Sequence, residues 1–378
     1  MNWFWIGLGI VLICAGLLDL FLSALNYDES GMITLRLQEW LWLALRAVFR
    51  RLPQRWNRIG RAQVVGLQVV MNFIAWVALV TIGFGFIYYG LMYDHTFTFS
   101  GSHIGRSMDY AIYFSVAQFS TVGATSMTPQ TTLLRVLGVV ETLIGLGLVT
   151  LAISFLISVF QTLTFLQALS SDLYLAASQD AGDPLAILAL YFPHGQPKGL
   201  SDFLGRLYQN LGSYYSGLRL HHTAYYYQSR NPHISIPYTV QILGGVIAAL
   251  RWGLPADSPA ADEPLLTLLA NQFTTFESYL DSRLQRQAAD PPPAQPYQAF
   301  AGAYATGQGT GDTWLDRFLA MDRRMRRMAQ MDQPPDPREA YQRYTEWLPF
   351  AYRAQRAEES IAHHLGYERS KEAYQSHD

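Results

Sequence analysis

The chain has 378 residues, half of them hydrophobic, and carries a formal net charge of -2 at pH 7. That charge excludes a protein that binds nucleic acid chiefly by neutralising many phosphates. The only cysteine, Cys14, excludes an internal disulfide and a multi-cysteine metal site. Apolar residues are concentrated before about Phe165, whereas Pro, Arg, Asp and Gln collect after it, so we expect a membrane half followed by a soluble half.

Three apolar stretches are long enough to cross a membrane as helices. The hydrocarbon layer is about 30 Å thick and a helix rises about 1.5 Å per residue, so about 20 residues suffice. The stretches are 3–25, 64–93 and 133–165. No basic residue precedes the first stretch and no small-x-small cleavage site follows it, which favours a membrane span over a cleaved signal peptide.

A basic segment joins the first two stretches. Positive residues are retained on the cytoplasmic side of a membrane, so this segment predicts an N-terminus outside the cell, loop 94–132 on the outer side and a cytoplasmic C-terminal domain. We therefore expect a multi-pass protein of the plasma or inner membrane. The arginines lie outside the apolar stretches, which disfavours a voltage sensor. They are Arg46, Arg50, Arg51, Arg55, Arg58 and Arg61.

Part of the basic segment, residues 35–49, carries apolar residues at helical spacing. This pattern predicts an amphipathic helix that lies against the lipid of the inner leaflet. Its apolar positions are Leu37, Trp40, Leu41, Ala44, Leu45 and Val48.

Residues 109–129, between the second and third stretches, read DYAIYFSVAQFSTVGATSMTP. An aromatic segment of helical length runs into the string from Ser120 to Gly123, and a proline follows at Pro129. Irregular backbone is tolerated at membrane depth only where it is buried in protein or lines a watery path. The segment therefore predicts a re-entrant pore helix and a loop that lines a path for ions.

This segment resembles the pore helix and selectivity filter of potassium channels, and the resemblance covers about residues 64–165. Together with the three apolar stretches it predicts an all-α membrane protein with three transmembrane helices. The resemblance implies that copies of the chain surround one pore as a homo-oligomer, a tetramer. Carbonyl oxygens of the filter would replace the water shell of a cation. The resemblance places Thr121, Val122, Gly123, Ala124 and Thr125 in the filter, and Ser120, Ser126, Tyr113 and Phe114 around it.

The filter departs from the potassium-channel pattern after Gly123. The family has Tyr-Gly-Asp, and this chain has Ala124, Thr125 and Ser126. Ala124 lacks the ring that packs against pore-helix aromatics in the family, and the β-branched Thr125 resists a positive φ. The string Thr-Val-Gly-Ala-Thr is similar instead to the filters of cyclic-nucleotide-gated channels. We therefore expect passage of K⁺ or Na⁺ with weak or no K⁺ selectivity, or a filter that is collapsed at rest.

Four residues inside the predicted spans are further candidates. Glu141 follows the pore loop and could support the filter by accepting hydrogen bonds from pore-loop amides, with a protonated or paired structural carboxyl as the alternative. Asp19 lies near the cytoplasmic end of its span, which favours snorkelling or a pair with an arginine. Gly145 and Gly147 could form a gating hinge, or could serve close helix packing.

The part after residue 165 is predicted to be helical, without a strand-rich pattern. His221 and His222 are adjacent and would point to different faces of a helix, so together with His233 they indicate packing rather than a metal site. Four arginines at 323, 324, 326 and 327 predict a solvated face. Helices are expected at 185–191, 200–218, 238–252, 265–284 and 314–331.

We divide the chain into six parts by composition. They are a first transmembrane helix (1–30), a basic amphipathic segment (31–63), the pore domain (64–165), a cytoplasmic helical domain (166–289), a Pro/Gly linker (290–312) and a C-terminal helical segment (313–378).

The predicted function is a potassium-channel-like monovalent cation channel. No segment combines a nucleophile, a base and an orienting residue, so an enzyme is not predicted. No cofactor or metal is predicted beyond permeant K⁺ or Na⁺, and the expected partners are copies of the chain and membrane lipid. The alternative function is a non-conducting membrane scaffold or sensor that keeps the pore fold for oligomerisation.

Overall fold

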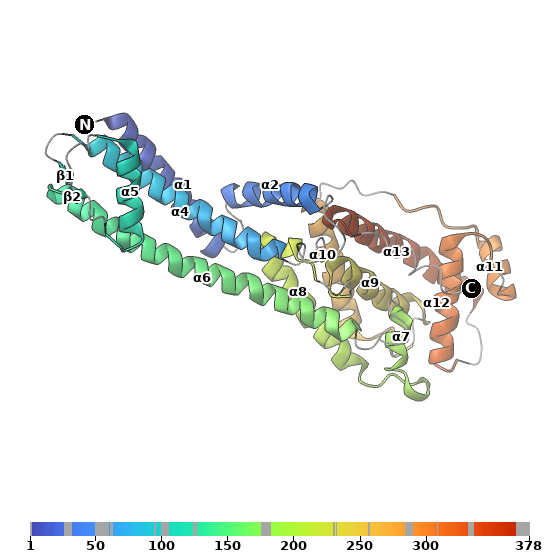
Figure 1. The fold of residues 1–378 in the computed structure, drawn as a ribbon. Coiled ribbons are helices and arrows are strands. Elements are labelled where there is room, and N and C mark those ends of the chain that lie inside the picture. Colours follow the sequence, from blue (N-terminus) through green and yellow to red (C-terminus); the bar gives the residue numbers. More distant parts are fainter. Residues whose placement is uncertain are drawn as a thin grey trace. The chain divides into compact units, whose positions relative to one another are not determined.

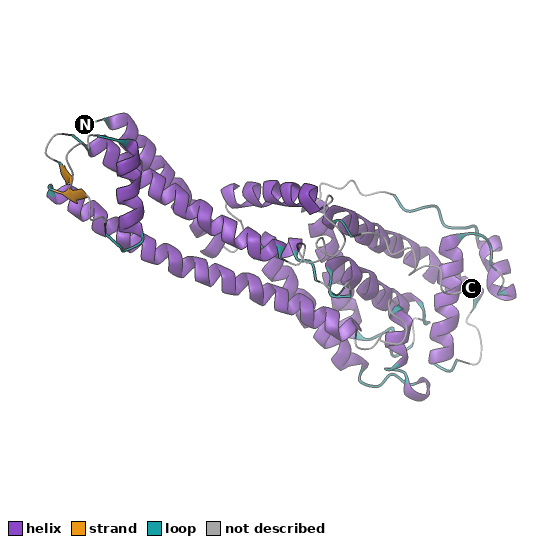
Figure 2. Cartoon of the chain, in the orientation of Figure 1, coloured by secondary structure: helices purple, strands orange, loops and turns teal. Residues whose placement is uncertain are grey.

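The structure, a computed structural model, forms two compact units: residues 1–162 with 217–227, and residues 163–216 with 228–378. Its regular elements are helices and one two-stranded ribbon (Figures 1 and 2). It describes residues 2–25, 32–49, 60, 63–93, 96–99, 106–123, 127–174, 183–229, 231, 233–255, 258–283, 290–307, 309–331 and 336–367.

The first unit contains three helices that are long and apolar enough to cross a membrane. They are α1 (Trp3–Leu25), α4 (Val64–Leu91) and α6 (Thr132–Tyr174), of which the part up to Thr162 belongs to this unit. The three predicted spans are therefore confirmed as helices. Helix α6 continues past its predicted end because buried leucines recur every three or four residues inside the second unit. These are Leu163, Leu166, Leu169 and Leu173.

Helices α1 and α4 pack closely because small residues face each other. A side chain at Gly9 would collide with the Gly83 carbonyl oxygen, and one at Gly83 would collide with Ile13. Nearer the start of α1, Trp5 lies edge-on to Tyr89 with ring centroids 5.6 Å apart. Small residues that let two backbones approach are a common way to join membrane helices.

The amphipathic helix α2 (Met32–Phe49) is fixed to both spans by Asp19 of α1. The Asp19 carboxylate accepts hydrogen bonds from the Ile33 amide at 2.8 Å, the Thr34 hydroxyl at 2.6 Å and the Trp76 indole of α4 at 2.9 Å. The sequence suggested that Asp19 snorkels or pairs with an arginine. Asp19 is only 4% exposed, so it does not snorkel, and it forms no ion pair with an arginine among the residues that the structure describes. The amides at the start of α2 supply the positive end of a helix dipole instead.

A short antiparallel ribbon lies where α4 ends and α6 begins. Strand β1 (Phe97–Phe99) pairs with β2 (Met127–Pro129), with Phe97 opposite Pro129 and Phe99 opposite Met127. Strands of three residues carry too little alternation to be recognised from sequence. The ribbon ties the segment after α4 to the segment after the filter.

The second unit is a helical bundle around α9 (Ile236–Trp252), which is buried along most of its length. Helix α8 (Leu200–Leu220) continues from this unit into the first. The helices that pack against α9 are α7 (Pro184–Ala189), α10 (Pro264–Arg283), α12 (Thr313–Met328) and α13 (Pro337–Leu365). Helix α11 (Tyr297–Thr306) packs against α13, and the 3₁₀ turn η1 (Pro193–Gly195) also belongs to this unit, whereas the turn η2 (His222–Tyr226) belongs to the first unit.

Helix α11 lies inside the segment 290–312, which the sequence assigns to a linker. Phe300 of this helix is fully buried, with its ring stacked on Tyr344 of α13 at 5.4 Å. The glycines that suggested a linker follow the helix, and Gly307 ends it with a φ of 67°. Phe300 and Ala303 of this helix thus contribute to the core of the second unit.

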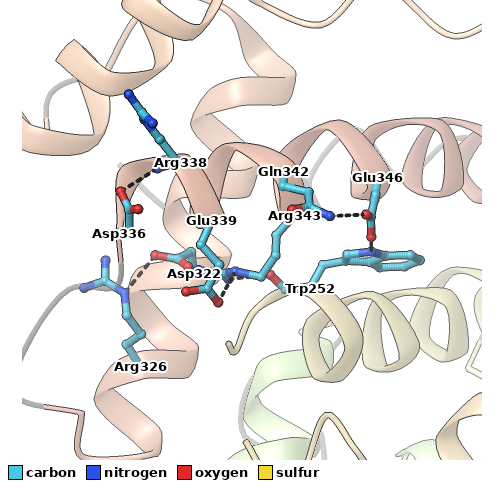
Figure 3. Close-up of polar contacts among 9 residues, drawn as sticks. All are labelled: Trp252, Asp322, Arg326, Asp336, Arg338, Glu339, Gln342, Arg343 and Glu346. Carbon is cyan, nitrogen blue, oxygen red and sulfur yellow. Dashed lines mark hydrogen bonds and ion pairs between the residues drawn. The ribbon is translucent and has the colours of Figure 1, made fainter. Parts of the chain in front are cut away.

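A buried ion-pair network joins α9, α12 and α13 (Figure 3). Asp322 accepts hydrogen bonds from Arg326 at 2.8 Å and from Arg343 at 2.9 Å. Arg343 also donates to the backbone oxygen of Trp252, at the end of α9. The arginines of α12 do not form one solvated face, because Arg326 pairs with Asp322 and Arg324 pairs with Asp183. Buried charges need such partners to offset their desolvation.

Candidate pore-loop site

The predicted pore helix is present as α5 (Met108–Phe119), with Asp109 in its first turn. The residues after it fold back onto its last carbonyls. The Thr121 amide donates to the Gln118 oxygen at 3.1 Å, and the Gly123 amide donates to the Ala117 oxygen at 3.0 Å. These bonds provide donors for carbonyl oxygens that have no partner within the helix, because they lie at its end. They also fix the start of the filter against the pore helix.

Two residues of the filter have a left-handed backbone. Gly123 has a φ of 76°, which costs glycine little, whereas Thr121 has a φ of 61°. A β-branched residue in this region carries strain of about 1–3 kcal/mol, and such strain is concentrated at functional sites. The sequence placed the strain at Thr125. Ala124, Thr125 and Ser126 lie outside the described residues.

The predicted aromatic pair of the pore helix is divided between two environments. Phe114 is 1% exposed, and its ring lies edge-on to Tyr88 at 4.9 Å. Tyr113 is 46% exposed on the other side of α5, and Val122 of the filter is 80% exposed. The Ser120 hydroxyl donates to the Ala117 oxygen at 3.2 Å. Phe114 therefore anchors α5 within its own chain, while Tyr113 and Val122 are exposed.

Glu141 of α6 lies behind the pore helix and is fully buried. Its carboxyl accepts a hydrogen bond from the Tyr88 hydroxyl of α4 at 2.7 Å and is hydrogen-bonded to the Ser115 hydroxyl of α5. The partners are hydroxyls rather than the expected amides, because the amides after α5 are already bonded to its carbonyls. One side chain thus joins α4, α5 and α6.

The hydrogen bonds of Ser115 indicate the protonation state of Glu141. The Ser115 oxygen lies 2.7 Å from the Thr81 backbone oxygen, which can only accept, so the single hydroxyl proton is directed there. The proton between Ser115 and Glu141 then belongs to the carboxyl. A neutral acid also avoids the desolvation that an unpaired buried charge would suffer. Of the two readings of Glu141 in the sequence, this geometry fits the protonated structural carboxyl.

Helix α6 also packs against the end of the pore helix. The Thr142 hydroxyl donates to the Gln118 oxygen at 3.1 Å, and a side-chain carbon at Gly145 would lie 2.9 Å from the Phe119 oxygen. Close packing therefore accounts for Gly145. A side-chain carbon at Gly147 would meet nothing within 4 Å, and α6 is one continuous helix through both glycines. A hinge at Gly147 stays a prediction.

The sequence did not single out Tyr88 as a partner of Glu141, nor Ser115 or Thr142. Each pairs with a residue 24 to 53 positions away, so no local spacing reveals it. The available signal was the isolated hydroxyl of Ser115 on an apolar, aromatic helix, because a buried hydroxyl needs a partner.

The pore helix, the start of the filter and the helices on both sides fall within one matched region. Residues 76–162 match the ion channel family. The resemblance stated from the sequence is thereby confirmed for this region, and an ion channel accounts for it better than an enzyme does. The ion-channel match covers most of α4, the whole of α5 and α6 up to the end of the first unit.

A relative of the chain is also a membrane protein. The uncharacterized membrane protein YdjJ of Bacillus subtilis (strain 168) is 28% identical over 160 residues. The match covers 42% of this chain and 45% of YdjJ, so the chain spans less than half of that relative. No solved structure gives a significant match.

Proposed function

We propose that this protein is a monovalent cation channel of the cell membrane that acts as a homotetramer. The observation that carries the proposal is a filter start folded onto the end of a pore helix, between two spans and inside the ion-channel region. One loop per chain cannot close a ring of carbonyl oxygens, so several copies must meet at one axis. The carboxyl end of α5 adds negative potential there, which favours a cation.

The surface of the first unit is consistent with an assembly in lipid. Helix α6 exposes apolar side chains at helical spacing along its length, including Val139, Leu143 and Ile153. Helix α2 exposes Trp40 and Leu43, which supports its position against the inner leaflet. Large exposed apolar faces require lipid or another protein surface to cover them. In the proposed orientation the N-terminus is outside and the second unit is cytoplasmic.

The proposal is tested by ion flux through the purified full-length protein in lipid vesicles. Uptake of K⁺, Na⁺ and Rb⁺ should exceed that of empty vesicles, and the particle in detergent should have the mass of four chains. A tetramer without flux would favour the alternative, a non-conducting scaffold or sensor, or a collapsed filter. A monomeric particle would contradict both the channel and the alternative.

The weak selectivity is tested by restoring the potassium-channel residues. The double variant Ala124→Tyr with Thr125→Gly should raise the K⁺ to Na⁺ flux ratio about tenfold, equivalent to about 1.4 kcal/mol between the two ions. The tyrosine would supply the missing ring, and the glycine would accept a positive φ. Thr128→Tyr is the matched control, because it adds a similar ring at an exposed position of β2. Unchanged ion ratios in the double variant would contradict the filter argument.

A further inference from the structure

One short segment from the C-terminal half of the chain belongs to the first unit. Residues Gly217–Tyr227, called here the docked segment, pack within the first unit, whereas the residues on both sides of them belong to the second. The segment holds the end of α8 and the turn η2. Its residues Thr223 and Ala224 are fully buried, and Tyr226 is 2% exposed. These buried side chains show that the segment is enclosed by the first unit and does not lie on its surface.

The docked segment is seated on α2. The Thr223 hydroxyl accepts a hydrogen bond from the Gln38 amide nitrogen at 2.5 Å. The Tyr226 ring lies 5.5 Å from that of Trp42, one turn further along α2. The Gln38 backbone oxygen accepts a longer bond of 3.4 Å from Gln68 of α4. Helix α2 thus connects the docked segment to the membrane span α4, and the turn η2 also packs directly against α4.

The docked segment also touches the inner helix α6. His221 lies edge-on to Phe155 with ring centroids 5.4 Å apart, and a side chain at Gly217 would collide with Thr162. Phe155 is in turn edge-on to Trp76 at 5.6 Å, and Trp76 donates to Asp19. Contacts therefore run without a break from the segment through α6 to α4 and α1.

The seat of the docked segment contains polar atoms without partners. Among the described residues, no hydrogen bond reaches the side-chain oxygens of Gln38 and Gln68, the indole nitrogen of Trp42 or Nδ1 of His221. Burying such groups unbonded is unfavourable, and water would satisfy them if the segment left. Ring packing holds the segment in place, whereas dehydration of these atoms favours its release.

We propose that the docked segment is a coupling element, which leaves and rejoins its seat on α2 and α6 and so passes movement of the second unit to the inner helix. Helix α8 runs unbroken from the second unit into the segment, and a helix transmits displacement along its axis. The link to ion flux rests on the proposed channel function. The docking equilibrium itself does not, and it can be measured separately.

Acid should favour release of the docked segment. Burial lowers the pKa of His221 from 6.5 to about 4, so the docked imidazole stays neutral while a released one binds a proton. Docking is therefore fully favoured above about pH 6.5 and is weakened as the pH falls toward 4. Other ionisable groups nearby are Glu39 of α2, which acts on Tyr226, Arg219 and His222 of the segment, and Asp19, which is reached only through Trp76 and Phe155.

The test measures how fast a cysteine in the seat reacts with a maleimide, using full-length protein in vesicles and a Cys14→Ser background. Ala224→Cys reports release, because Ala224 is fully buried. Ser216→Cys, on the exposed face of α8, is the matched control. Thr223→Val keeps the side-chain shape but removes the acceptor for Gln38, so labelling at position 224 should rise about tenfold. Phe155→Leu should raise labelling at position 224 similarly. Acid slows maleimide labelling of every cysteine, so the effect of pH is read from the rate at 224 divided by the rate at 216. This ratio should rise in acid, and His221→Phe should abolish that rise.

Three results would overturn the proposal. Labelling at position 224 as fast as at 216 in the otherwise unchanged protein would show that the segment is not docked. Labelling that responds to Thr223→Val but not to Phe155→Leu would separate the segment from the inner helix. A rise in labelling with unchanged flux, in vesicles that conduct, would remove its role in the pore. If no variant conducts but labelling follows the expected pattern, docking and its link to α6 are supported while the channel function fails.

Discussion

Glu141→Ala is expected to destabilise the first unit by about 3 kcal/mol, because it leaves the buried hydroxyls of Tyr88 and Ser115 short of a partner and opens a cavity. Glu141→Gln is expected to stay within about 1 kcal/mol of the unchanged protein, since an amide of the same shape reproduces both bonds. Its oxygen accepts from Tyr88, and its nitrogen donates to Ser115 as the protonated carboxyl does.

The thermal midpoint of the purified protein in detergent measures this difference. Tyr88→Phe is the matched control, because it removes one of the bonds and should lower the midpoint by about a third as much as Glu141→Ala. If Glu141→Gln were as damaging as alanine, the carboxyl would have to act as a charged group, and the assignment of its proton would be wrong. In conducting vesicles, Glu141→Ala should also change flux, since α5 would lose its bond to α6.

The sequence predicted the elements whose signal is local. The ends of α1 agree with the first apolar stretch, and α5 was expected from the aromatic segment that runs into Ser120. The length of an apolar stretch and the presence of an irregular segment between two such stretches can each be read from one continuous part of the sequence. The spans and the pore helix could therefore be predicted without knowledge of their neighbours.

The partners of the buried polar side chains could not be predicted in this way. Asp19 bonds to Trp76, which is 57 residues away, and Gln38 bonds to Thr223, which is 185 residues away. Neither separation leaves a periodic pattern, and each bond depends on which helices the fold brings together. Helix α11 was missed for a related reason, because a burial site for Phe300 exists only once α13 is in place.

Asp19 gives a contrasting test, because its surroundings differ from those of Glu141. Both Asp19 oxygens face donors only: the amides of Ile33 and Thr34, the Thr34 hydroxyl and the Trp76 indole. An amide would turn its own N–H groups toward these donors. Asp19→Asn should therefore be nearly as damaging as Asp19→Ala, and each should cost about 3 kcal/mol or more.

Trp76→Phe is the control for Asp19, because it removes one donor and leaves the cap on α2, so it should cost about 1 kcal/mol. The measurement is again the thermal midpoint in detergent. If Asp19→Asn were tolerated as well as Glu141→Gln, an uncharged group would suffice at both positions. The expected opposite responses would instead show that each carboxyl has the protonation that its neighbours require, a carboxylate at the start of α2 and an acid behind the pore helix.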